Sequence, residues 1–374
     1  MNLLFYLLVF LLVLIVSSTT NKLLPFLPMP LIQILLGIGI GLCLPNNQYH
    51  LDTELFLALV IGPLLFREAQ EADITSILKH WRIVLYLIFP VIFISALSMG
   101  GVAHVLWASL PLAACVAVGA ALGPTDLVAF ASLSQRFSFP KRVSNILKGE
   151  GLLNDASGLV AFRMALIAWT TGTFSLTQAG SSLAISIVGG FAVGLITALI
   201  NRFLHTFLLS VRATDIASEL LLELSLPLLT FFIAEEIHVS GIIAVVVAGI
   251  LKASRFKKIN LLEAQVDTVT ETVWQTVTFM LNGSVFVILG MELEMIAEPI
   301  LKSAFYNNVL LLVTIFLLTF LLFAIRFVMI YGFYAFRIKK LHKSLDKYVK
   351  DMLLLTFSGV KGTVSIATIL LIPS

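Results

Sequence analysis

Apolar residues along this chain occur in long continuous runs rather than in alternation with polar residues. Runs of about 20 apolar residues predict α-helices that cross a membrane, because that length of helix spans the hydrocarbon core of a bilayer. Continuous runs also disfavour a transmembrane β-barrel, whose strands alternate apolar and polar positions. The pattern predicts an all-α polytopic membrane protein with twelve spans, near residues 3–18, 26–44, 53–69, 83–104, 106–134, 146–171, 181–208, 219–236, 238–251, 272–295, 306–336 and 350–372.

Composition and loop lengths support a single membrane domain over residues 1–374. The chain is 59% hydrophobic and only 12% charged, with a mean hydropathy of +1.04, which excludes an ordinary soluble domain. The first run, Leu3–Val16, has no basic segment before it and no small-residue cleavage site. We therefore expect a retained first span rather than a signal peptide. Cys43 and Cys115 lie in apolar segments without metal-binding spacing, so we expect two inert thiols.

Basic residues are distributed very unequally between the two sides of the predicted membrane domain. With the N-terminus placed outside, twenty of the 24 lysines and arginines fall in or beside cytoplasmic loops, and only Lys302 falls in an outer loop. Such an excess is typical of the cytoplasmic side. We expect a multi-pass protein of the cell membrane with its N-terminus outside and its basic loops cytoplasmic. The net charge of +3 follows from this asymmetry and indicates no nucleic-acid partner.

Several polar residues lie at a similar depth in the predicted spans. A helix rises about 1.5 Å per residue, which places them about 13 to 16 Å from the cytoplasmic ends of their spans. The middle of a bilayer core lies at about 15 Å. A charged side chain there costs about 2.5 to 3.5 kcal/mol and usually marks an ion or proton pathway. Five spans contribute such residues: Asp126, Asp155, Asn282, Arg326 and Lys361.

Two spans contain residues that should interrupt a helix near this depth. Gly123-Pro124 should break the fifth span, because proline lacks an N–H and its ring clashes with the preceding turn. The twelfth span carries the glycine-rich segment Ser358–Gly362. One interrupted polar span in each half of the chain is typical of a transporter binding site. A kinked packing helix is the alternative for Gly123-Pro124 alone, and the adjacent Asp126 favours the binding site.

The sixth span carries its polar residues on adjoining faces. Small residues share a face with Asp155, which lets another helix approach closely. Glu150 and Asn154 form a neighbouring pair four residues apart, and Arg326 is long enough to reach Glu150. We therefore predict a structural ion pair between Glu150 and Arg326. The residues of the close-approach face are Gly151, Asp155 and Gly158.

Residues 123–166, GPTDLVAFASLSQRFSFPKRVSNILKGEGLLNDASGLVAFRMAL, resemble the monovalent cation:proton antiporters, specifically the NhaP-like sodium/proton exchangers. The specific part is GEGLLNDA, preceded by Thr125-Asp126. Together the similar segments cover nearly the whole chain in the right order. The others are PLLFREAQEAD (63–73), AEEIHVSGIIAVVVAGIL (234–251), VWQTVTFMLNGSVFVILG (273–290), IRFVMIYG (325–332) and FSGVKGTVSIATILLIP (357–373).

This resemblance implies an inverted-repeat antiporter fold in which discontinuous helices cross at the midplane. It implies a moving core domain, with spans at about 83–171 and 306–372, and a dimerisation domain, with spans at about 3–69 and 219–295. A homodimer in the lipid bilayer is implied with it. The cation- and proton-binding positions correspond to Asp155, Asn154, Asp126 and Thr125. The structural ion pair and the charge that balances helix ends correspond to Glu150, Arg326 and Lys361.

The chain departs from the family pattern at three places. Gly151 stands where the family has a serine, which removes one expected hydroxyl ligand. Arg67 stands where the family has a glutamate, and Glu68 follows one position later. The family has about thirteen spans and a cytoplasmic tail. The sequence stops at Ser374, so we expect the last span and the tail to be missing from it.

These observations predict a secondary active transporter that exchanges Na⁺ for H⁺ and serves pH homeostasis. Burial favours a protonated Asp155 and a bound cation favours the ionised form, so proton and cation compete for one carboxylate. Asn154 is neutral where electrogenic relatives have a second aspartate, which implies an electroneutral cycle. The Thr125 hydroxyl and carbonyl oxygens freed at the break would complete an oxygen shell for the transported cation. No resident metal or cofactor is expected.

Other functions stay open or are disfavoured. Potassium or Li⁺ could replace Na⁺, because the choice depends on ligand geometry, and a non-transporting shortened membrane protein is a further alternative. A cation channel is disfavoured, since no selectivity-filter ring or repeated pore loop is visible. An enzyme is disfavoured too, because the histidines are dispersed and no nucleophile triad or metal-binding spacing occurs.

Overall fold

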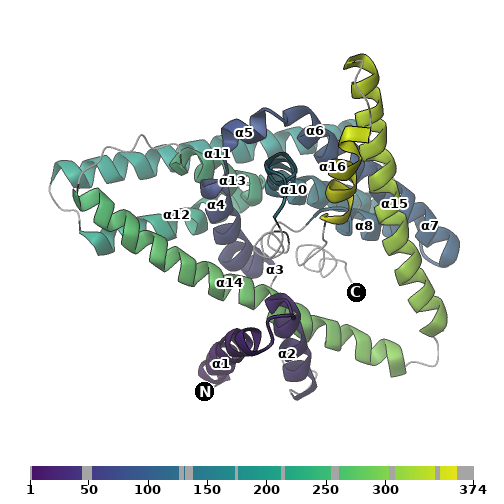
Figure 1. Cartoon of the computed structure of the whole chain (residues 1–374), viewed down its shortest axis with the longest axis horizontal. Coiled ribbons are helices and arrows are strands. Elements are labelled where there is room, and N and C mark those ends of the chain that lie inside the picture. The colour runs from purple at the N-terminus through teal and green to yellow at the C-terminus, as the bar shows by residue number, and fades with distance from the viewer. Residues whose placement is uncertain are drawn as a thin grey trace. The chain divides into compact units, whose positions relative to one another are not determined.

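The fold is helical throughout the part of the chain that the computed structural model describes (Figure 1). No strand occurs among these residues, so the predicted all-α class is confirmed. The chain divides into two compact units. Unit 1 comprises Met1–Tyr49, Thr75–Phe174 and Phe286–Ser374, and unit 2 comprises His50–Ile74 and Ser175–Val285. The described residues are 2–43, 53–125, 130, 138–172, 176–211, 215–253, 261–302, 308–341 and 346–359.

The two units share one long helix in sequence, α14 (Leu261–Lys302), which continues from unit 2 into unit 1. The short helix α5 (Ile74–Leu78) begins where unit 2 gives way to unit 1 at residues 74 and 75. The remaining helices of unit 1 are α1 (Asn2–Leu23), α2 (Met29–Cys43), α6 (Trp81–Tyr86), α7 (Ile92–Leu106), α8 (Leu112–Ala121), α10 (Lys141–Thr171), α15 (Asn308–Leu341) and α16 (Asp346–Phe357). Those of unit 2 are α3 (Thr53–Phe56), α4 (Gly62–Glu71), α11 (Leu176–Ser210), α12 (Ile216–Glu236) and α13 (Gly241–Ala253).

Five described helical segments are long and apolar enough to cross a membrane by length and composition. Four of them coincide with a predicted span to within four residues at either end, and Val313–Arg337 begins seven residues inside the predicted span 306–336. Shorter apolar helices, such as Met29–Cys43 and Gly241–Ala253, overlap other predicted spans. The five long segments are Trp81–Leu106, Gly180–Ser210, Ile216–Glu236, Thr268–Met295 and Val313–Arg337.

Two spans contain a wide π-helical turn next to a proline. Leu57–Ile61 separates α3 from α4 and is followed by Pro63, while Leu87–Val91 separates α6 from α7 and contains Pro90. A proline ring clashes with the carbonyl four residues before it, and a wider turn relieves this clash. In unit 1 the wide turn leaves the Ile88 carbonyl available to a side chain of α10.

Small residues bring the helices of unit 1 together around the interrupted fifth span. A Cβ atom on Gly119 of α8 would lie 2.4 Å from the Ala96 carbonyl oxygen of α7, and one on Gly100 would lie 2.6 Å from Val116. Helices in lipid associate through such close backbone approach. Seven buried residues of α7, α8 and α10 form the core here: Ala96, Ala117, Ala120, Ala121, Ala161, Phe162 and Ala165.

Unit 2 is packed by the same principle. Gly194 of α11 lies against the Ala244 carbonyl of α13, where a Cβ atom would come within 2.3 Å of the oxygen. Gly249 of α13 lies in the same way against the Phe66 carbonyl of α4, at 2.6 Å. The core- and dimer-type division stays a prediction. In the structure, Met1–Tyr49 belongs to the same unit as 83–171, whereas the prediction assigned spans within 3–69 to the dimerisation domain.

Candidate functional site

The fifth span is broken where the sequence predicts it. Helix α8 ends at Ala121, and Gly123, Pro124 and Thr125 follow in non-helical conformations. Pro124 cannot donate a backbone hydrogen bond to the preceding turn, and with Gly123 before it a continuous helix is disfavoured at this point. Thr125 is nevertheless 6% exposed, which makes its backbone polar groups dependent on partners inside the protein.

Helix α10 supplies the partners of this break. It runs without interruption from Lys141 to Thr171, after Pro140 and before Gly172. Glu150, Asn154 and Ser157 follow one another at intervals of four and three residues and therefore share one face of the helix. The side chain of each is buried. A single face of α10 thus carries a carboxylate, an amide and a hydroxyl into the interior of unit 1.

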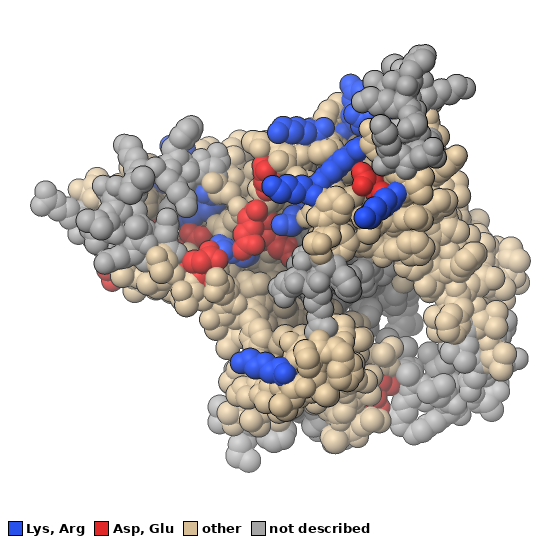
Figure 2. All heavy atoms as spheres, viewed as in Figure 1, with Lys and Arg blue, Asp and Glu red and all other residues tan. Residues whose placement is uncertain are grey.

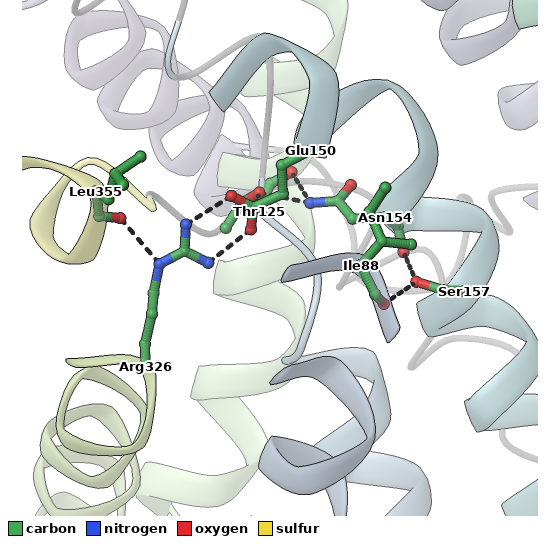
Figure 3. Close-up of polar contacts among 7 residues, drawn as sticks. All are labelled: Ile88, Thr125, Glu150, Asn154, Ser157, Arg326 and Leu355. Atoms are coloured by element: carbon green, nitrogen blue, oxygen red, sulfur yellow. Dashed lines mark hydrogen bonds and ion pairs between the residues drawn. The ribbon is translucent and has the colours of Figure 1, made fainter. Parts of the chain in front are cut away.

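Glu150 forms a bidentate ion pair with Arg326 of α15 (Figure 3). The Arg326 Nη1 and Nη2 atoms lie 2.6 and 2.7 Å from the two carboxylate oxygens, and the third guanidinium donor, Nε, lies 3.0 Å from the Leu355 carbonyl oxygen. Glu150 is 1% exposed and Arg326 3%. Buried ions need such complete pairing, and the guanidinium thereby joins α10, α15 and α16.

Thr125 and Asn154 bind each other across the break. The Asn154 Nδ2 atom donates to the Thr125 carbonyl oxygen at 3.1 Å and to the Thr125 hydroxyl. That hydroxyl in turn donates to a Glu150 carboxylate oxygen at 3.3 Å. Asn154 therefore supplies a side-chain donor to the Thr125 carbonyl at the break, and the amide, hydroxyl, carboxylate and guanidinium form one continuous chain (Figure 3).

One acceptor atom of this cluster makes no hydrogen bond to a described residue. The Asn154 Oδ1 atom is buried and has no hydrogen-bond partner among the described residues, although a buried polar atom normally has one. The residue itself is fully buried. An amide oxygen is a suitable ligand for a hard cation, so this atom is a candidate ligand beside the next residue of α10, Asp155.

Two glycines and a serine hold the cluster in place. A Cβ atom on Gly359 would lie 2.7 Å from the Arg326 Cζ atom, so the guanidinium rests on the Gly359 backbone. Gly158 lies against Pro124 in the same way, at 2.1 Å from the ring Cγ atom. The Ser157 hydroxyl lies 2.9 Å from the Ile88 carbonyl oxygen at the wide turn before α7. The Gly158 and Ser157 contacts fix the level of α10 against the break after α8 and against the wide turn before α7.

The structure thus brings together four of the seven residues predicted for the site, all in unit 1: Thr125, Glu150, Asn154 and Arg326. Asp155 lies in α10, and its side chain is outside the described part of the structure. Asp126 and Lys361 also lie outside the described residues.

Sequence reasoning missed three contributors to this cluster. The Leu355 carbonyl and Ser157 carried no signal of their own, because apolar and small residues are abundant in every span. Gly359 belongs to the FSGVKG segment, where a glycine beside a predicted charge was a usable signal. Asn282, predicted at the same depth, lies on α14 in unit 2, and its Oδ1 atom has no partner among the described residues. No group of three or more metal-ligating side chains was found among the described residues.

Arg67, which replaces a glutamate of the family pattern, is neutralised within unit 2. Its guanidinium pairs with Glu71 at 2.7 Å and with Glu271, and it lies 6.0 Å from the centre of the Trp274 ring. Gln70, one turn along α4, donates to Glu223 at 2.8 Å, and Lys252 pairs with the same glutamate at 3.2 Å. The arginine is therefore part of a charged network that joins helices of unit 2.

An interrupted span facing a polar helix inside an apolar bundle is the construction typical of secondary transporters. A profile of the family described as "Sodium/hydrogen exchanger, transmembrane" matches residues 7–374. The chain belongs to this family.

Curated relatives and a solved structure agree with this assignment. The chain is 35% identical to the "Sodium, potassium, lithium and rubidium/H(+) antiporter" of Bacillus pumilus, over 96% of this chain and 54% of that protein. It is also 35% identical to the protein of the same name from Bacillus subtilis, over 100% and 56% of the two chains. The chain therefore spans about half the length of these relatives. The sodium proton antiporter MjNhaP1 of Methanocaldococcus jannaschii has the same fold, with a TM-score of 0.69 at 19% identity over 99% of this chain and 86% of that one.

Proposed function

We propose that this chain exchanges Na⁺ for H⁺ across the cell membrane by competition at Asp155. The observation that carries the proposal is the paired state of the neighbouring charges on α10. Glu150 is neutralised by Arg326 in a buried bidentate pair, so it does not compete for a cation. Asp155, five residues further along the helix, is then the carboxylate that can take up either a proton or a cation.

The free Asn154 Oδ1 atom supports cation binding next to this carboxylate. The Thr125 hydroxyl and carbonyl, expected from the sequence to be cation ligands, both accept from Asn154 in the structure. The proposal therefore makes Asn154 the direct amide ligand and gives Thr125 the role of holding it. Because Asn154 is neutral, one proton would be exchanged for one cation in an electroneutral cycle. Asp126 and Lys361 keep their proposed roles as a further ligand and a helix-end charge.

Potassium exchange is the second candidate. The curated relatives from the two Bacillus species are named for sodium, potassium, lithium and rubidium, and the amide and carboxylate oxygens proposed here would accept any of these ions. A homodimer with the N-termini outside and the basic loops cytoplasmic is part of the same proposal. Its orientation is supported by the charge asymmetry of the loops.

Everted vesicles containing the full chain test this function. A pH gradient should be dissipated on addition of Na⁺, and separate additions of K⁺ and Li⁺ would rank the cations. The variant Asp155→Asn should abolish the dissipation, whereas Asp215→Asn, an aspartate that precedes α12 in unit 2, should leave it unchanged. Collapsing the membrane potential with the permeant anion thiocyanate, in a K⁺-free medium, should leave the Na⁺ response unaltered if the cycle is electroneutral. Sodium-driven proton flux that survives Asp155→Asn would refute the proposal.

A further inference from the structure

Two arginines from antiparallel helices reach the same end of unit 1. The Tyr86 and Phe333 rings lie 5.0 Å apart, and the Tyr86 hydroxyl donates to the Met329 carbonyl oxygen at 3.3 Å, so α6 and α15 are level at these residues. Figure 1 shows α15 running toward the end of the unit at which α6 begins. One turn further toward that end, on the same helix faces, stand Arg82 and Arg337.

Neither arginine has an acidic partner among the residues that the structure describes. Arg82 is exposed, with its guanidinium 5.5 Å from the centre of the Trp81 ring, and no described residue pairs with Arg337. Arg142, at the start of α10, shows the contrast: it lies 3.7 Å from Asp351 and within 5.0 Å of the centre of the Tyr348 ring. A bound anion would supply the counter-ion that the described residues do not provide to either arginine.

The surroundings of the two arginines are those of a membrane interface. Arg82 and Arg337 lie at the ends of the apolar spans Trp81–Leu106 and Val313–Arg337. Each is preceded by an exposed aromatic residue, Trp81 at 50% exposure and Phe336 at 78%. Tryptophan side chains favour the headgroup level of a bilayer, with basic residues beside them, and an exposed phenylalanine ring there would be covered by lipid chains. Figure 2 shows further lysine and arginine side chains over the same end of the unit, near the positions of α6 and α16.

We propose that Arg82 and Arg337 form a binding site for an anionic phospholipid, with both guanidinium groups on the phosphate and with Trp81 and Phe336 against the acyl chains. Guanidinium groups bind phosphate through paired N–H donors. A zwitterionic headgroup carries its own cation, which would be repelled by two arginines, so the site selects a lipid with net negative charge. The exposed aromatic flanks favour a lipid over free phosphate, because only a lipid supplies apolar chains to cover them.

Binding to the purified full chain tests this site. Phosphatidylglycerol is titrated into detergent-solubilised protein, and the rise in melting temperature gives an apparent affinity, with phosphatidylcholine titrated in parallel. Arg82→Gln and Arg337→Gln should each weaken the phosphatidylglycerol affinity by about fivefold. The double variant should lose less than the product of the two single effects, because both side chains bind one phosphate. Arg82→Lys, which keeps the charge and loses the paired donors, should fall between wild type and Arg82→Gln.

Arg202→Gln serves as the matched control, since Arg202 is an exposed basic residue near the end of α11 in unit 2. It should leave the affinity unchanged. The proposal is overturned if Arg202→Gln weakens binding as much as Arg82→Gln, which would show a general surface attraction. It is also overturned if the two single effects multiply fully, if phosphatidylcholine binds equally well, or if inorganic phosphate at equal concentration displaces the lipid. Melting temperatures without added lipid, equal across the variants, show that each one folds.

Discussion

Gly158 of α10 lies directly against Pro124, the residue that breaks the fifth span. A Cβ atom at position 158 would come within 2.1 Å of the proline Cγ atom and 2.8 Å of Cδ. The ring therefore fills the space left by the missing side chain. Asn154 lies one turn earlier on α10, and this contact places its amide opposite the Thr125 carbonyl, to which it donates at 3.1 Å.

Gly158→Ala should disrupt this arrangement. Overpacking of a filled interior costs about 1 to 3 kcal/mol, which exceeds the helix propensity of about 1 kcal/mol that alanine gains over glycine. The melting temperature of the purified protein should fall, and cation exchange in vesicles should be reduced. Gly101→Ala in α7 is the control, because no heavy atom lies within 4 Å of a Cβ atom there. Equal melting temperatures for the two variants would contradict the role of the Gly158–Pro124 contact.

The Glu150–Arg326 pair should show strong energetic coupling. Removing one member of a buried pair leaves an uncompensated charge and costs about 3 to 5 kcal/mol. Glu150→Gln and Arg326→Gln should therefore each be severely destabilising, while the double variant should lose much less than their sum. The measurement is a double-mutant cycle on unfolding free energies in detergent. Additive losses would mean that the two side chains act independently, despite their separation of 2.6 Å.

Thr125 should act through its hydroxyl group. Thr125→Val keeps the shape of the side chain but removes the donor to Glu150 and the acceptor for Asn154. A buried group left without its partner costs about 1 to 3 kcal/mol, so the variant should melt at a lower temperature and show a higher KM for the transported cation. Thr125→Ser keeps the hydroxyl and should restore most of both properties. Failure of serine to do so would assign the effect to packing of the methyl group.

The start of α12 should depend on pH through Asp215. This residue caps the helix: its carboxylate accepts from the Ser218 N–H at 2.8 Å. Hydrogen bonds from the Ser218 side chain and backbone hold the pKa of Asp215 below its ordinary value of 3.8. Because the folded carboxylate is the stronger acid, the cap stabilises the folded state fully above that value and stops doing so as pH falls through the lowered pKa.

Hydrogen exchange of the first-turn amides of α12 measures this dependence after correction for the intrinsic rate. Protection should be constant at neutral and mildly acidic pH and should fall only in the acid range. Asp215→Asn also accepts a capping bond but does not titrate, so its protection should stay constant as pH falls. Parallel acid profiles for the wild type and Asp215→Asn would exclude the carboxylate as the cause.

The sequence determined the class of the protein and the position at which the fifth span is interrupted. Run length predicts the helices because a bilayer of fixed thickness requires a fixed number of apolar residues. The break before Thr125 follows from the local pair Gly123-Pro124, because proline lacks the N–H of a helical turn and glycine favours non-helical conformations. The motif around Asn154 predicted the family, and the matched profile confirms it.

Only the tertiary structure decided which polar groups pair. Glu150 and Arg326 are 176 positions apart, and their contact depends on the rotation and level of α10 and α15. In a soluble protein, the apolar stripe of each helix would indicate both its rotation and its level relative to its neighbours. These spans are apolar on all sides, so periodicity does not show which face is buried against protein. The bond between Asn154 and the Thr125 carbonyl, and that between Arg326 and the Leu355 carbonyl, follow from the packing of glycines against neighbouring backbones. The hydrophobic pattern does not predict this packing, because lipid and the protein interior are equally apolar and both accept the same residues.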